Sequence, residues 1–126
     1  MKNLTLKLLD KVFTIHSLPV DSAIPTAVFS ADIYFIAKTF EEVSIVLPSS
    51  VNIVSDDSEP DWQALEVVGP LDFTLTGILS SISSVLANNN ISIFAISTFD
   101  TDYILVKTNK IEAAIAALRN NNYQVI

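Results

Sequence analysis

Asp102 is the residue whose place in the sequence best suits the binding of a small polar molecule. It follows the polar segment Ser97–Thr101 and begins the apolar run Tyr103–Val106. A carboxylate at the start of a strand can accept charge-assisted hydrogen bonds from an ammonium group or a basic side chain. The alternative is a solvated or turn-forming aspartate, which is the commoner role of Asp in loops. Asp100 fits that second role better.

A second candidate is the start of a helix that the sequence predicts after Gly69. The first residues of this segment include Asp72, Thr76 and Gly77. The N-terminus of a helix leaves backbone N–H groups unpaired and carries a partial positive charge, so it suits a carboxylate. Gly77 has no Cβ, so a ligand or another backbone could approach it closely. The alternative is that Gly77 only permits close packing of the helix on a sheet, and that Asp72 caps the helix.

Residues for catalysis or metal binding are sparse. His16 is the only histidine, and its segment carries no nearby Asp or Ser motif, so we expect a structural role for it. One histidine and no cysteine argue against a zinc site. Asp56, Asp57 and Glu59 lack the spacing of a calcium loop and fit a solvated linker better. We therefore expect no cofactor, no metal site and no enzymatic activity.

Composition excludes several classes of partner. The chain has 126 residues and a formal net charge of −7, and its few Lys and Arg residues are scattered, which argues against nucleic-acid binding. The uncharged stretch between Phe73 and Phe99 is cut by Asn88-Asn89-Asn90, so its apolar part is too short to span a membrane. The absence of cysteine fits a reducing compartment. We expect a soluble, cytoplasmic protein.

Hydrophobic periodicity defines the elements of the second half. The predicted order is strand, helix, strand, strand, helix, strand, which is that of the ferredoxin-like unit: four antiparallel strands with two helices on one face. Asn109 with Glu112 is a plausible capping box for the second helix. The predicted segments are Trp62–Val68, a helix with apolar residues from Leu75 to Leu86, Ile91–Ser97, Asp102–Lys107, a helix over Ile111, Ile115 and Leu118, and Tyr123–Ile126.

The first half is predicted to be rich in strands and poor in helix. It shows no repeat that aligns residue by residue with the second half. The polar segment Ser55–Pro60 reads as a linker, which gives domains at 1–58 and 59–126. The four predicted strands are Leu4–Leu9 and Val12–Leu18, meeting at Asp10-Lys11, and Ile33–Lys38 and Val43–Leu47, on either side of Thr39–Glu42.

Three motifs together resemble a known family. They are Glu66–Ile78, Ile93–Val106 and, more weakly, Thr39–Val46. The chain resembles the small bacterial proteins with paired ACT (amino-acid-binding regulatory) domains, which are related to the eukaryotic cytosolic arginine sensors. The resemblance implies an α+β fold, with a ferredoxin-like βαββαβ ACT domain preceded by a β-rich ACT-like lobe.

The resemblance also implies a ligand site between the two lobes. In the family, the glycine that matches Gly77 lies where an amino acid meets the first helix, and the aspartate that matches Asp102 contacts the ligand. A strand edge at Ser44 and Ile45 would offer backbone groups, unless that strand is paired on both sides. The candidate ligand-binding residues are Asp72, Thr76, Gly77, Ile78, Thr98, Phe99, Asp102, Ser44 and Ile45.

Three functions remain open from the sequence. The favoured one is an amino-acid-binding regulatory or sensor module without catalysis, which forms a homodimer and acts on an unknown protein target. The second is an ACT-fold protein–protein interaction module without a ligand. The third is a small ferredoxin-like enzyme, which would need acid–base groups around a cleft. Trp62 and Phe73 are expected to be packing residues in any of the three.

Overall fold

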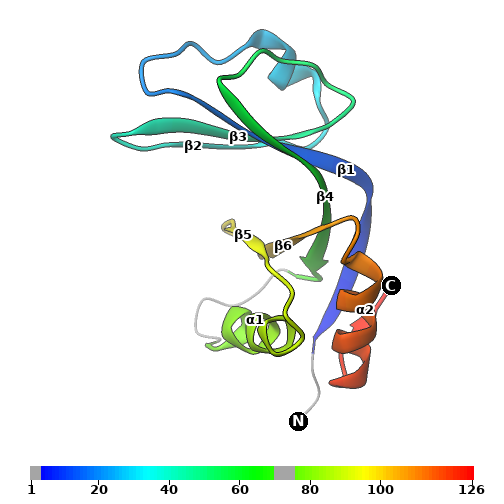
Figure 1. Cartoon of the computed structure of the whole chain (residues 1–126). Coiled ribbons are helices and arrows are strands. Elements are labelled where there is room, and N and C mark those ends of the chain that lie inside the picture. Colours follow the sequence, from blue (N-terminus) through cyan, green and yellow to red (C-terminus); the bar gives the residue numbers. More distant parts are fainter. Residues whose placement is uncertain (1–3, 70–75) are drawn as a thin grey trace. The chain divides into compact units, whose positions relative to one another are not determined.

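The computed structural model describes residues 4–69 and 76–126 (Figure 1). The contacts divide the chain into two compact units. The C-terminal unit combines the residues up to Asp10 with Gln63–Ile126, and the N-terminal unit comprises Lys11–Trp62. Strands β1 (Thr5–Pro19) and β4 (Asp57–Val67) each contribute to both units. The domain boundary expected between residues 58 and 59 stays a prediction.

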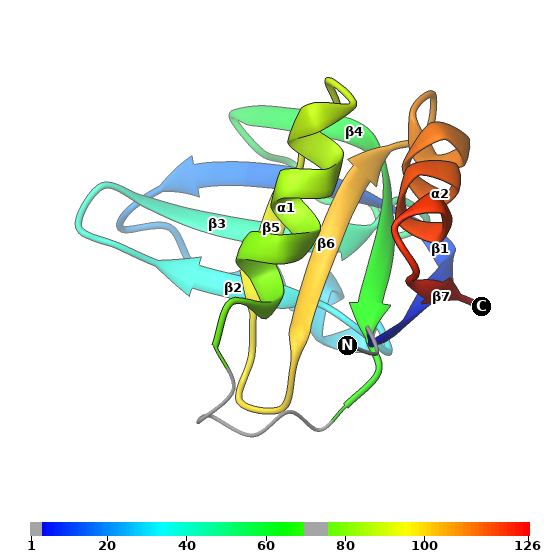
Figure 2. The same cartoon turned by 90° about the horizontal axis from the view of Figure 1, so that it is seen from below.

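The C-terminal unit has the predicted order of elements. After β4 come α1 (Ile78–Asn88), β5 (Phe94–Ser97), β6 (Asp102–Lys107), α2 (Ile111–Asn120) and β7 (Gln124–Val125). Its strands lie in the order β7-β1-β4-β6-β5, and both helices cover the same face of the sheet (Figure 2). The α+β, ferredoxin-like fold predicted from the sequence is confirmed for this unit.

One strand in this sheet was not expected. The start of β1 lies between β7 and β4, where a four-stranded ferredoxin-like sheet would pair its last strand with its first. Strand β7 runs parallel to β1, with Thr5 opposite Gln124. The backbone N–H of Ile126 donates to the carbonyl of Leu6 over 2.8 Å, and that of Leu8 donates to the carbonyl of Ile126 over 2.9 Å.

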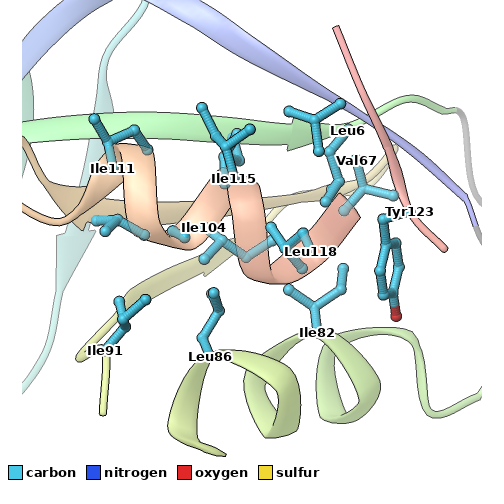
Figure 3. Close-up of a cluster of buried hydrophobic side chains, with 14 residues drawn as sticks. Leu6, Val67, Ile82, Leu86, Ile91, Ile104, Ile111, Ile115, Leu118 and Tyr123 are labelled. Carbon is cyan, nitrogen blue, oxygen red and sulfur yellow. The ribbon is translucent and has the colours of Figure 1, made fainter. Parts of the chain in front are cut away.

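The core of the C-terminal unit lies between the sheet and its two helices (Figure 3). Helix α1 buries Ile82 and Leu86, four residues apart, because residues at that spacing lie on the same face of a helix. Tyr123 closes one end of this core, and its hydroxyl lies 2.7 Å from Oγ of Ser81 on α1. Helix α2 contributes Ile111, Ala114, Ile115, Ala117 and Leu118 to the buried set.

The N-terminal unit is built on an antiparallel sheet in the order β2-β3-β1. Strands β2 (Phe35–Lys38) and β3 (Glu42–Pro48) form the predicted hairpin. A short 3₁₀ helix, η1 (Thr26–Ser30), precedes them and buries Val28 completely. The core of the N-terminal unit comprises the buried residues Leu18, Val28, Val43, Ile45 and Leu47.

Two predictions about strand boundaries were wrong. Strand β1 continues through Asp10-Lys11 as one strand, because Asp10 is exposed and Lys11 is partly exposed, so the strand buries neither polar side chain fully. The predicted linker Ser55–Pro60 overlaps β4, which already begins at Asp57. Residues 57–61 of β4 are all exposed, and proline is tolerated at exposed strand positions that need no N–H donor.

The predicted capping box of α2 is also absent. The N-cap residue is Lys110, and no side chain caps this helix end. The backbone N–H of Lys110 instead donates to the carbonyl of Lys107 over 2.9 Å, so a tight turn leads from β6 into the helix. Asn109 lies one position too early to cap the helix.

The hairpins β2–β3 and β5–β6 follow one pattern. Each has a four-residue loop that begins with threonine, between the strand pairs Lys38/Val43 and Ser97/Asp102. The first and fourth loop residues are joined by a backbone hydrogen bond of 2.9 Å in the first hairpin and 2.8 Å in the second. The expectation of no alignable repeat was therefore wrong for this segment. Phe35, Thr39, Phe40 and Ile45 recur at the same spacing as Phe94, Thr98, Phe99 and Ile104.

Candidate functional site

The loop of the β5–β6 hairpin brings together three of the predicted site residues, Thr98, Phe99 and Asp102. Thr98 closes the loop, because its backbone N–H donates to the carbonyl of Thr101 over 2.8 Å. Its Oγ1 also accepts from the backbone N–H of Thr101 at 3.3 Å and lies 3.1 Å from the carbonyl oxygen of Thr101. The side chain of Phe99, at the tip, is 80% exposed. The loop is thus fixed by its own bonds while it presents an aromatic ring to solvent.

Asp102 is held by a serine on the opposite strand. Ser97 Oγ donates to Oδ1 of Asp102 over 2.5 Å, which is in the range of charge-assisted hydrogen bonds. The two residues face each other in the β5–β6 ladder. Within residues 4–69 and 76–126, no other side chain bonds to Asp102, whose side chain is partly exposed. Its second oxygen can therefore accept a hydrogen bond from a ligand.

Thr101 attaches the loop to the adjacent strand β4. Its hydroxyl donates to the carbonyl oxygen of Val67, the last residue of β4, over 2.5 Å. Thr101 is only 6% exposed, so this bond is shielded from water. The backbone N–H of Val68 in turn donates to the carbonyl of Thr5 on β1 over 2.9 Å. The loop that carries Asp102 is therefore connected to the interior of the sheet.

A second acid–hydroxyl pair lies beside the loop. The hydroxyl of Tyr103 donates to Oε2 of Glu66 over 3.1 Å. Burial raises the pKa of Tyr103 above its ordinary value, and the hydrogen bond to Glu66 and the charges of Glu66 and Asp100 raise it further. The phenol consequently remains a hydrogen-bond donor at neutral pH.

The segment Thr76–Ile78 leads into α1. Gly77 is the N-cap residue, with a φ of 76°, and its carbonyl accepts from the N–H of Ser81 over 2.9 Å. Among the described residues other than its chain neighbours and its own helix backbone, a Cβ built at Gly77 would meet nothing within 4 Å, so close packing against them does not explain this glycine. Its left-handed backbone conformation does, since L-residues with a side chain rarely adopt it. Asp72 and Phe73 lie outside the described residues.

Ser44 and Ile45 lie on β3, an inner strand. β3 pairs with β1 on one side and with β2 on the other, so the backbone of this strand is not a free sheet edge. The alternative of a strand paired on both sides is the one observed. Ser44 is partly exposed, whereas the side chain of Ile45 is fully buried in the core of the N-terminal unit.

His16 is a buried side chain within hydrogen-bond distance of a serine. It is 8% exposed, and its Nδ1 lies 2.8 Å from Oγ of Ser55. Burial lowers the pKa of His16 below its ordinary value of 6.5, so the ring is neutral near pH 7. No group of three His, Asp or Glu residues in the described part of the chain could hold a metal ion. In that same part, no helix is long and apolar enough to span a membrane.

Sequence comparison identifies the family. The ACT domain family matches residues 57–120, which is more than half of the chain. The chain belongs to the ACT domain family.

The sequence of this ACT protein is similar to those of proteins named as arginine sensors. It is 32% identical over 122 residues to the human protein named "Cytosolic arginine sensor for mTORC1 subunit 1", covering 89% of this chain and 37% of the sensor. The mouse protein of the same name matches with the same identity and coverage. The ACT chain thus spans little more than a third of the length of these relatives.

Solved structures share the fold. A protein from Agobacterium tumefaciens is 33% identical and superimposes with a TM-score of 0.90, covering 100% of this chain and 94% of that one. The regulatory subunit of aspartate kinase from Thermus thermophilus has a TM-score of 0.64 at 13% identity, covering 94% and 98% of the two chains. At that identity the likeness to the kinase subunit shows the fold alone.

The sequence did not single out Ser97 and Thr101, the two residues of the ACT chain that hold the loop around Asp102. The pairing of Ser97 with Asp102 could have been predicted from the sequence. A four-residue hairpin loop over residues 98–101 places Ser97 directly opposite Asp102, so the expected strand boundaries already implied the pair. The bond from Thr101 to Val67 joins residues far apart in the sequence, and no local pattern indicates it.

Proposed function

We propose that this chain is a regulatory or sensor module that binds an amino acid and has no catalytic activity of its own. The support is its membership of the ACT family together with its similarity to proteins named as arginine sensors. Since the chain spans 37% of those sensors, what they do applies here only as a proposal. L-Arginine is the first ligand to test, and other amino acids remain candidates.

The proposed site uses two segments of the C-terminal unit. Asp102 would accept hydrogen bonds from the ligand's α-ammonium or from a basic side chain, beside Thr98 and Phe99. The backbone N–H groups that follow Gly77 at the start of α1 would suit the ligand's carboxylate, because the first N–H groups of a helix have no partner within the helix. The other proposed members rest on the family resemblance, and they are Asp72, Thr76, Ile78, Ser44 and Ile45.

The proposed mechanism is thermodynamic linkage. An amino acid that binds between the two lobes would stabilise the arrangement in which both contribute contacts, by an amount set by its concentration relative to Kd. A separate protein that recognises this arrangement would then sense the amino acid. We propose a homodimer in the cytoplasm as the acting form. A single monomeric species in sedimentation velocity at micromolar concentration would overturn the dimer.

The decisive experiment is a thermal-shift screen of the purified protein against the twenty amino acids. We expect a saturable rise in melting temperature with one or a few of them, and its loss in Asp102→Ala. Asp100→Ala is the matched control, because Asp100 is an exposed carboxylate in the same loop. A well-folded protein that responds to no amino acid would overturn the proposed function.

One observation supports the second candidate, an interaction module without a ligand. Phe40, at the tip of the β2–β3 hairpin, is completely exposed at 102%, and Val54 is 91% exposed. Large apolar side chains that are held in solvent often anchor protein interfaces. Silence across the amino-acid screen, together with a stable oligomer that Phe40→Ser dissociates, would establish this candidate instead.

A further inference from the structure

We infer that Ser97 is a positioning residue for ligand recognition, which holds the Asp102 carboxylate in place for the ligand's ammonium or basic group. The inference rests on the proposed function and adds to it a residue outside the candidate set. Ser97 does not contact the ligand in this proposal. It acts through its hydrogen bond to Oδ1 of Asp102.

The geometry gives Ser97 this role. The two residues are direct partners in the β5–β6 ladder, so their side chains lie on the same face of the sheet. The 2.5 Å bond occupies one carboxylate oxygen and fixes the orientation of the other. An aspartate that is already oriented loses less side-chain freedom when a ligand binds, which strengthens binding.

The other hairpin provides an internal control for what the loop needs in order to fold. In the β2–β3 hairpin, Thr39 builds the same four-residue loop: its N–H donates to the carbonyl of Glu42, and its Oγ1 accepts from the N–H groups of Glu41 and Glu42. The positions that correspond to Ser97 and Asp102 are occupied there by Lys38 and Val43. The loop therefore forms without a serine–aspartate pair.

The comparison separates two sets of residues in the β5–β6 hairpin. The threonine and the exposed phenylalanine occur in both hairpins, so they belong to the shared loop design. The Ser97–Asp102 pair occurs in only one hairpin. Ser97 is exposed and Asp102 is partly exposed, so water could satisfy both side chains and folding does not require them to bond to each other. Val43, the counterpart of Asp102, is 1% exposed and packs in the core. A pair that is unnecessary for the loop is available for a ligand.

The test is a set of calorimetric titrations with L-arginine, or with the amino acid that gives the largest thermal shift if L-arginine gives none. Ser97→Ala is expected to weaken binding about tenfold, which corresponds to the loss of one hydrogen bond to a charged group. Ser97→Thr keeps a hydroxyl and suits a strand, so it should restore most of the affinity. Lys38→Ala, at the corresponding position of the other hairpin, should leave the affinity unchanged.

Two further measurements distinguish positioning from a general structural role. The melting temperature of ligand-free Ser97→Ala should stay close to that of the wild type. In an Asp102→Asn background, Ser97→Ala should weaken any residual binding by clearly less than tenfold, because two residues that act through one contact are not additive.

The outcomes separate this inference from the proposed function. If the wild type binds an amino acid and Ser97→Ala binds it equally well, the positioning role is wrong and the sensor function stands. An equal loss in Ser97→Thr and Ser97→Ala would also overturn the role, since the hydroxyl would then be irrelevant. If the wild type binds no amino acid, the proposed function fails and the positioning role fails with it.

Discussion

Thr101 donates its hydroxyl to the carbonyl oxygen of Val67 over 2.5 Å and thereby joins the β5–β6 loop to the end of β4. The contact links two segments that are far apart in the sequence. Because Thr101 is 6% exposed, water cannot readily replace either partner. The loop that carries the candidate ligand residues is therefore part of the folded sheet, and the stability of the protein should depend on this hydroxyl.

Replacing Thr101 by valine tests that dependence. Thr101→Val preserves the side-chain shape and removes the donor, so we expect the free energy of unfolding to fall by about 1–3 kcal/mol. Urea denaturation followed by circular dichroism measures the change. Thr101→Ser, which keeps the hydroxyl, should recover part of the loss. A serine variant that is no more stable than the valine variant would contradict this account.

Truncation of two phenylalanines to alanine should change the free energy of unfolding by very different amounts. Phe13 is completely buried, so Phe13→Ala should lower the free energy of unfolding by about 3–5 kcal/mol through the lost apolar contacts and the cavity left behind. Phe40 is completely exposed, so Phe40→Ala should change it by no more than about 0.5 kcal/mol. Parallel denaturant titrations compare them. A large loss on truncation of Phe40 would mean that its ring is buried in solution, for instance in a dimer.

Gly77 should be sensitive to backbone strain and insensitive to the volume of a methyl group. Its φ of 76° is unfavourable for alanine, and we expect Gly77→Ala to cost about 1–2 kcal/mol of stability. Gly77→Asn should cost less despite its larger side chain, because asparagine adopts left-handed conformations more readily and, among residues 4–69 and 76–126, none beyond the immediate chain neighbours and the helix's own backbone lies within 4 Å of the new Cβ. Thermal melts of the two variants rank them. The reverse order would indicate a steric effect.

The stability of the protein should depend on pH through His16. Burial lowers the pKa of His16 in the folded state below its ordinary value of 6.5 in the unfolded chain. Between the two pKa values the unfolded chain binds more protons, so this contribution to stability is fully present above pH 6.5 and is lost as the pH falls through the folded pKa. Urea denaturation at several values between pH 5 and pH 7.5 measures the slope.

A variant isolates this effect from the titration of the carboxylates. His16→Gln keeps a polar side chain of similar reach, although its hydrogen bond to Ser55 need not survive. The decline in stability from pH 7.5 to pH 5 should be shallower in His16→Gln than in the wild type. Equal slopes would show that His16 does not titrate differently in the folded and unfolded states.

Local patterns predicted the elements of the C-terminal unit well. Strand β6 was predicted as Asp102–Lys107 and is observed with those bounds, because polar residues flank a short apolar run. Strands β1 and β4 were less predictable. Polar residues interrupt each of them at exposed positions, and what keeps those positions in a strand is pairing with segments that are distant in the sequence.

Some features of the candidate site could likewise be predicted from local sequence, and others depend on the tertiary fold. The positions of Thr98 in a loop and of Asp102 at the start of a strand could be predicted, because the local sequence changes from polar to apolar residues there. The buried, doubly paired environment of Ile45 depends on which strands flank β3, and this is a property of the tertiary fold. Likewise, glycine is needed at position 77 because of the positive φ angle there, and the neighbouring residues in the sequence do not determine this angle.

The pairing of β7 with the start of β1 has a consequence for how the chain acquires its structure. Thr5 and Gln124 are partners in that ladder, so the contact closes a loop of almost the whole chain. On the ribosome, the first strand emerges long before its partner β7, and the C-terminal unit cannot be completed until Gln124 has been synthesised. The contiguous N-terminal unit has no such delay. Contacts of such long sequence separation slow folding, so the sheet that carries Asp102 should form after the N-terminal unit.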